Sequence, residues 1–200
     1  EADKGLTEAA NQAKNSMVQA NYFTAARTLK VKRGNIMTGF HKNVMQTMDL
    51  MVADIQLKPN DETSEKQKLE IINKEVFESW LVSKIIITKA EANFSEQLLM
   101  LRLRLSKLLD CELDVEDMPV SPAVFCNAFN ESLTEFFAEI YVEKIIYKIF
   151  EDEFINHLGA LYDEINGILI NSGILPEISL EEIAIAHRKI NEKNNPISEG

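Results

Sequence analysis

Glycine, proline and cysteine are scarce in this chain, which has seven, five and two of them among 200 residues. A many-stranded sandwich or barrel needs frequent turn residues, and a Gly-rich nucleotide-binding α/β fold needs glycines in its phosphate loop. The composition disfavours both classes. It favours long helices joined by few turns.

The two cysteines, Cys111 and Cys126, are too few for a disulfide framework, so we expect reduced thiols in a cytoplasm. Cys126 has apolar neighbours, Phe125 and Phe129, which predicts a buried and unreactive thiol. Long hydrophobic runs are also missing. Because a bilayer-spanning helix needs about 20 apolar residues, we expect no membrane insertion.

Signatures of catalysis and of metal binding are missing as well. The three histidines are far apart and none forms a ligand pair on a helical face. An acidic run over residues 110–117 imitates a calcium loop, but Val115 and Ser121 stand where that loop needs Gly and Glu. We therefore expect no catalytic residues, no cofactor and no metal, and the chain is not expected to be an enzyme.

Acidic residues are absent from Ala9 to Met48, a stretch that carries six Lys and Arg. Since the whole chain carries −11, the rest of it carries −17, which disfavours general binding to nucleic acid or anionic membranes. Arg27, Lys30 and Arg33 share a broad helical face and are candidate contacts for an anion or a partner. The alternative is that the acid-rich remainder of the chain neutralises them.

Helical periodicity dominates the sequence. It predicts a first helix over residues 6–22, a second from Leu29 to about Leu57 with weak points at its two glycines, and a third over 74–110. Ser121-Pro122 starts a fourth helix to Leu133. A fifth runs from about residue 138 to 168, where Gly159 allows close approach of another helix. Gly173 stops this stretch, and a capping box of Ser179 and Glu182 begins a last helix to about 192.

The connections complete the expected architecture. We predict a mobile loop over about 58–68, an acidic connection over about 111–120 and a frayed tail over about 193–200. Residues 1–200 are expected to form one domain of the all-α class, an irregular bundle of five or six helices, several of them long and antiparallel. Because the chain starts at Glu1 without Met or a signal pattern, we expect a piece of a larger protein.

The end of the predicted third helix is apolar on two sides. Leu98, Leu101 and Leu105 follow one helical seam, while a second group lies off it. We expect that second group either to pack against another part of the fold or to face a partner. It consists of Leu99, Met100 and Leu103.

Several strings in the chain resemble the proteobacterial family filed as domain of unknown function 1631, in its N-terminal region. They are residues 119–122 (PVSP), 147–150 (YKIF), 158–166 (LGALYDEIN) and 173–176 (GILP), with 23–27 (FTAAR) and 76–81 (VFESWL) earlier. The resemblance implies a helical region of a larger bacterial protein. Some members carry the label thymidine phosphorylase, which no residue constellation here supports.

These features predict a non-enzymatic interaction module of a cytoplasmic bacterial regulatory or scaffold protein. Its partner would be another protein or a second copy of the chain. The alternative is binding of a phosphate-bearing ligand, such as a nucleotide, a second messenger or nucleic acid, by the basic strip of Arg27, Lys30 and Arg33.

Overall fold

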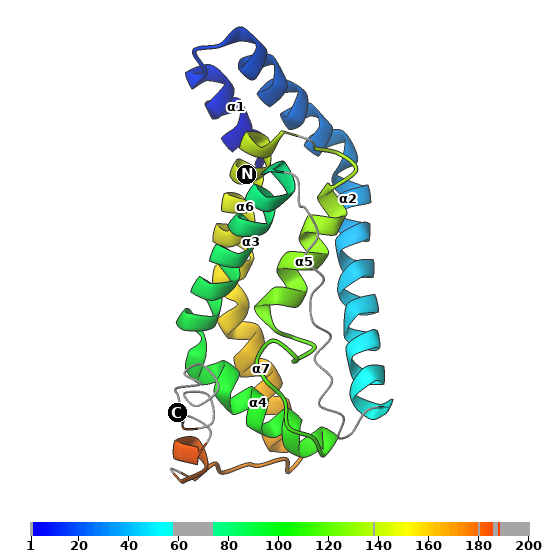
Figure 1. The fold of residues 1–200 in the computed structure, drawn as a ribbon, viewed down its shortest axis with the longest axis vertical. Coiled ribbons are helices and arrows are strands. Elements are labelled where there is room, and N and C mark those ends of the chain that lie inside the picture. The colour runs from blue at the N-terminus through cyan, green and yellow to red at the C-terminus, as the bar shows by residue number, and fades with distance from the viewer. Residues whose placement is uncertain (1, 58–73, 138, 180, 186–187, 189–200) are drawn as a thin grey trace, which may run out of the picture.

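The computed structural model describes residues 2–57, 74–137, 139–179, 181–185 and 188, and within them it contains helices and no strand. The all-α prediction is confirmed. The molecule is elongated, with α2 running along one side and the remaining helices packed beside it (Figure 1). The helices are α1 (Ala2–Gln12), α2 (Ser16–Leu57), α3 (Lys74–Asn93), α4 (Ser95–Leu109), α5 (Pro122–Leu133), α6 (Ile140–Glu153), the short 3-10 helix η1 (Ile155–His157) and α7 (Leu158–Asn171).

The predicted first helix over residues 6–22 is wrong, because the chain turns at residues 13–15. Asn15 causes the restart: its Oδ1 accepts hydrogen bonds from the backbone N–H groups of Met17, at 2.8 Å, and Val18, at 3.3 Å. This is the geometry of an N-cap. The helix that starts there, α2, has 42 residues and continues through Gly34 and Gly39, so the weak points predicted at the two glycines are not observed.

The predicted third helix is two helices, α3 and α4, which meet at Phe94. The backbone hydrogen bonds from Phe94 to Ala90 and from Leu98 to Phe94 persist at 2.9 Å, so the chain bends there without unravelling. The Phe94 ring lies against Gly159 of α7, where an added Cβ would come within 3.0 Å of it. The close approach predicted at Gly159 is confirmed, and it explains the bend, because α4 must turn to pack on α7.

The predicted fifth helix is also divided, into α6, η1 and α7. The break falls at Phe154, whose φ of −125° and ψ of −60° are not helical. Its ring centroid lies 5.2–5.5 Å from those of Phe40, Phe125 and Phe150. Packing of this ring therefore overrides a local pattern that favours one continuous helix. These two divisions raise the number of α-helices in the described residues between 2 and 171 to seven.

Several predicted boundaries are confirmed. Ser121-Pro122 starts α5 with Pro at the first position, although the Ser121 hydroxyl makes no capping hydrogen bond. Gly173 has φ +78° and follows α7, and its N–H donates to Ile170 O. Ser179 and Glu182 form the capping box, with Ser179 N–H donating to Glu182 Oε2 at 2.7 Å, and residues 181–185 are helical. The loop at 58–68, the tail at 193–200 and the end of the last helix lie outside the described residues.

Buried side chains form two separate cores. In the part of the chain that the structure describes, the large core contains sixteen buried residues. They come from α2 to α7, η1 and the acidic connection, and include Phe125, Tyr147, Phe150 and Tyr162. The small core has seven, at the opposite end of the molecule where α1 and the first half of α2 meet the ends of α5 and α6 (Figure 1). Its members are Leu6, Ala25, Ile36, Leu133, Phe137, Val142 and Ile146.

Candidate functional site

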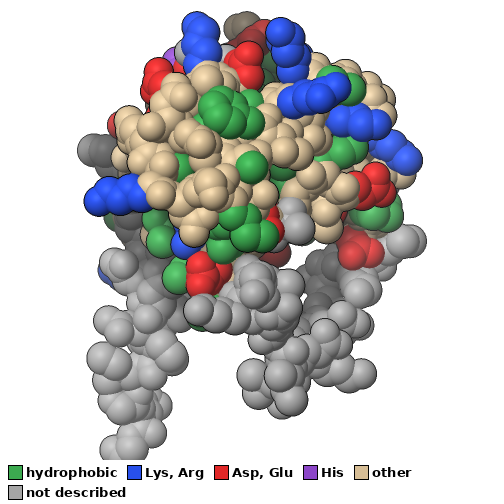
Figure 2. Space-filling view, turned by 90° about the horizontal axis from the view of Figure 1, so that it is seen from above, with side chains coloured by type: hydrophobic (Ala, Val, Ile, Leu, Met, Phe, Trp, Pro, Cys, Tyr) green, Lys and Arg blue, Asp and Glu red, His purple; other side chains and the backbone are tan. Residues whose placement is uncertain are grey.

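The basic strip of Arg27, Lys30 and Arg33 lies on α2 with all three side chains exposed. Within the described part of the chain, none of them forms an ion pair. Seen from the end that holds the α1–α2 turn, Lys and Arg side chains gather along the α2 edge, at the right of the view (Figure 2). The sequence raised the alternative that the acid-rich remainder neutralises these cations. Among the described residues, no direct ion pair does so.

Two of these cations belong to a longer exposed face, which we call the outer stripe of α2. Its members follow one another at steps of three or four residues, so they share one narrow side of the helix. All of them are exposed. The outer stripe consists of Phe23, Arg27, Lys30, Gly34, Met37, His41 and Met45.

Gly34 lies in the middle of this stripe, and no other part of the described fold packs against it. A Cβ added there would meet nothing within 4 Å, whereas one added to Gly39 would lie 3.6 Å from Ser132 Cβ. Glycine in a helix interior costs about 1 kcal/mol relative to alanine. The fold therefore carries this cost at Gly34 without an internal packing gain.

A second exposed face lies on α3, and we call it the aromatic face. Phe77, Trp80, Leu81 and Ile85 are between 43% and 53% exposed although all four are large and apolar. The Phe77 and Trp80 rings stack with centroids 5.7 Å apart. Sequence reasoning missed this face, although the three- and four-residue steps among these positions would have shown it. The same helix buries Ile86, Ile87 and Ala90 in the large core.

Ion pairs border the aromatic face. Lys144 of α6 contacts Glu78 at 3.0 Å, and Lys84 contacts Glu116 of the acidic connection at 3.3 Å. Exposed pairs of this kind contribute only about 0–1 kcal/mol each to stability. They do place a neutralised polar rim around exposed apolar side chains, an arrangement typical of protein–protein interfaces.

The predicted partner-facing group on α4 is not exposed. Leu99 is only 6% exposed, and Met100 and Leu103 are half-buried. For Leu99 the first alternative holds: its side chain packs inside the molecule, so the expectation that it faces a partner is wrong. This segment is apolar on two sides because α4 buries side chains on both of them.

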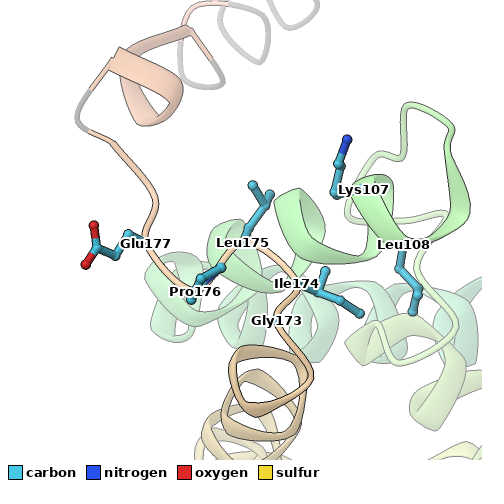
Figure 3. A pocket seen from close by; sticks show the side chains of 7 residues that line it. All are labelled: Lys107, Leu108, Gly173, Ile174, Leu175, Pro176 and Glu177. Atoms are coloured by element: carbon cyan, nitrogen blue, oxygen red, sulfur yellow. The ribbon is translucent and has the colours of Figure 1, made fainter.

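An open pocket of about 570 Å³ lies where the C-terminal end of α4 meets the segment after α7 (Figure 3). Its lining residues are Lys107, Leu108, Gly173, Ile174, Leu175, Pro176 and Glu177. The Glu177 side chain points away from the others in Figure 3. The buried side chain of Arg104 in α4 donates hydrogen bonds to Leu175 O, in the pocket lining, at 3.2 Å and to Asn166 Oδ1 at 2.6 Å. These bonds hold the segment in place, and the lining brings no acid and base together.

Two buried titratable groups of the large core are Cys126 and Tyr162. Burial, followed by the charges of Glu151 and Glu91, raises the pKa of the Cys126 thiol to about 12. Burial likewise raises the pKa of Tyr162 well above its ordinary value. Cys126 is fully buried, which confirms the predicted position of this thiol. With its thiolate disfavoured, Cys126 is a poor nucleophile.

The described residues contain neither a cluster of metal ligands nor a helix that could span a membrane. Among them, no three His, Cys, Asp or Glu side chains gather closely enough to hold a metal ion. None of their helices combines the length and hydropathy that crossing a bilayer requires. The acidic connection at 111–120 contains turns and bends and follows Asp110, which closes α4 with φ +52°.

Fold and surfaces together define the class: an all-α bundle domain whose unusual chemistry lies on the outer faces of α2 and α3. A family model described as "Protein of unknown function (DUF1631) N-terminal domain" matches residues 1–173. Because this match covers most of the chain, the chain belongs to that family, in agreement with the motifs in its sequence. No curated protein and no solved structure matches the chain.

Proposed function

We propose that this chain is a non-enzymatic helical interaction module of a cytoplasmic bacterial regulatory or scaffold protein. The observation that carries the proposal is the aromatic face of α3. Tryptophan is enriched among residues that dominate binding energy at interfaces. Phe77, Trp80, Leu81 and Ile85 lie together on one side of a helix that is otherwise anchored in the large core.

Energetics favour an interface at this face. Exposed apolar side chains that lie together are a cost in water, and burying each Leu, Ile or Phe completely yields about 1.5–3 kcal/mol. The rim is already paired, so docking need not leave Glu78 or Lys84 without a counter-charge. A partner that covers this face would gain hydrophobic energy without a large desolvation penalty.

The test is affinity capture with the full chain, followed by mass spectrometry, using three baits. Wild type and Leu50→Ala should retain the same proteins, because Leu50 is an exposed leucine on α2, away from the aromatic face. Trp80→Ala should lose them. The same captured set with all three baits would contradict the proposal, as would a strict monomer that captures nothing while a metabolite stabilises it thermally.

The second candidate function is recognition of a phosphate-bearing ligand by the basic strip. The observation that favours it is that Arg27, Lys30 and Arg33 are exposed and form no ion pair in the described residues. A nucleoside triphosphate should then raise the melting temperature, and the effect should weaken with added salt. Reversal of the three charges should abolish it. An unchanged shift in that variant would dispose of this candidate.

A further inference from the structure

The outer stripe of α2 contains chemistry that the fold itself does not use. It combines two cationic side chains, Arg27 and Lys30, with three large apolar ones. The apolar members, Phe23, Met37 and Met45, are 44–59% exposed. No Asp or Glu occurs anywhere from Ala9 to Met48. An ordinary solvated helix face mixes charges of both signs, so this face differs from one in both sign and apolar content.

Gly34 adds an independent observation. Its position is open to solvent and lies between Lys30 and Met37 on the stripe. Helices pack 8–10 Å apart depending on the side chains at their contact, and a glycine permits the closest approach. None of the described residues comes within 4 Å of a Cβ built there, so the missing side chain leaves room for a helix that approaches from outside.

The chemistry of the stripe selects one occupant. Its backbone N–H groups are inside a continuous helix and cannot cradle a phosphate, and a phosphate would gain nothing from Phe23 or Met37. A helix with apolar residues on one side and acidic residues along its edges would complement both the cationic and the apolar side chains of the stripe. Its acids would meet Arg27, Lys30 and Arg33, and its apolar side would cover Phe23, Gly34 and Met37.

We infer that the outer stripe of α2 docks an acidic amphipathic helix of a partner protein. This inference rests on the proposed function, because it names the chemical class of a partner for the same interaction module. The two helices would pack side by side, with Gly34 at the point of closest approach. Charge attraction at the edges sets the specificity and speeds association.

The experiment measures binding of the full chain to labelled synthetic helices by fluorescence anisotropy. One peptide has leucine and alanine on one face and glutamate along both edges. A second has the same composition in shuffled order, and a third replaces glutamate by lysine. Only the first should bind, and its affinity should fall as salt rises. Equal binding of the shuffled peptide, or no binding of any peptide, would overturn the inference.

Charge reversal with a matched control tests the edges. Arg27→Glu with Lys30→Glu should weaken binding of the acidic helix about tenfold or more, because two attractive contacts become repulsive. Lys32→Glu with Lys42→Glu changes the net charge equally, but these exposed residues lie off the stripe, so binding should change little. An equal loss in both variants would mean that only overall charge matters, which contradicts a docking site.

Gly34→Leu tests the point of closest approach. Leucine favours helix more than glycine does, so this variant should melt at a higher temperature and yet lose binding. Asn35→Leu adds the same side chain one residue further along, about 100° around the helix, and should keep binding. If tripolyphosphate binds instead and Gly34→Leu leaves that binding unchanged, the stripe is a phosphate site and the docking inference is wrong.

Trp80→Ala separates this inference from the proposed function. That variant should bind the acidic helix normally, because Trp80 lies on α3. If peptide binding fails while capture that depends on Trp80 persists, only the inference about α2 falls. If both fail, the proposed interaction function falls as well.

Discussion

The large and small cores stabilise their ends of the molecule by different means. A network of aromatic rings runs through the large core: Phe129 and Phe150 stack at 3.8 Å between centroids, and Phe40 meets both edge-on. The small core is mostly aliphatic and has fewer than half as many buried residues. Its bond between Asn21 Nδ2 and Tyr141 OH, 2.6 Å long, is polar and only part-buried.

This difference bears on function because each core supports one candidate surface. The large core anchors α3 through Ile86, Ile87 and Ala90, so the aromatic face is presented on a firmly held helix. The first half of α2, with the basic strip, depends on the small core and on α1. Local opening is easier where fewer apolar contacts must break, so we expect the small-core end to open first.

The largest expected effect comes from truncating the aromatic stack. Phe150→Ala should lower the free energy of unfolding by about 3–5 kcal/mol, because it removes a ring that packs against Phe129, Phe154 and Phe40. Urea denaturation measures this loss. Phe23→Ala is the control, since that ring is exposed on α2 and should cost less than about 0.5 kcal/mol. Equal losses would mean that the stack does not anchor the large core.

A smaller and more local effect is expected from Leu6→Ala, which truncates the larger of the two fully buried residues of α1. We expect a loss of about 2 kcal/mol, the low end for such a change, because the small core is thin. Hydrogen exchange should quicken in α1 and in the first half of α2 while α5 and α7 keep their protection. Uniformly faster exchange would show that the two cores unfold as one unit.

The next effect concerns the turn between α1 and α2. Asn15→Ala removes the acceptor for the Met17 and Val18 N–H groups and should cost about 1 kcal/mol. Exchange of those two amides should quicken most. Asn11→Ala, a change at an exposed position of α1, is the control and should stabilise slightly or have no effect. If both variants behave alike, Asn15 is not the residue that restarts the helix.

Local signals explain which boundaries the sequence predicted. Gly173 adopts a left-handed conformation, and Ser179 with Glu182 forms a capping box, so nearby residues alone specify these boundaries. Asn15 is also a local signal, but the Ala-rich sequence on both sides hid it. The breaks at Phe94 and Phe154 have no local signal. Both are set by rings that pack against distant helices, and such contacts cannot be found from neighbouring residues alone.

The candidate surfaces show the same division. The sequence indicated the basic strip because a stretch without acids is visible directly in the residue order. It misplaced the apolar surface, because Leu99 and Trp80 are both apolar residues on helices and only the fold decides which one is covered. Leu99 is 6% exposed and Trp80 53%. Periodicity gives the faces of a helix but not the number of neighbours around it.

Alkaline pH is expected to destabilise the large core, and the substitution with the smallest effect at neutral pH tests this. Burial raises the pKa of Tyr162 and of Cys126, both in the large core. In the unfolded chain these groups lose protons near pH 10 and 8.5, while the folded chain keeps them, so stability falls as pH rises above about 8.5. Tyr162→Phe should therefore make this decline shallower.

At neutral pH Tyr162→Phe should change stability little, because the Tyr162 hydroxyl is buried and has no hydrogen-bond partner among the described residues. Tyr141→Phe is the comparison in the small-core region. It removes the acceptor for Asn21 Nδ2 and should cost about 0.5–1.5 kcal/mol at pH 7. Urea denaturation from pH 7 to 11 measures both quantities. An alkaline decline as steep in Tyr162→Phe as in wild type would mean that Tyr162 does not contribute to it.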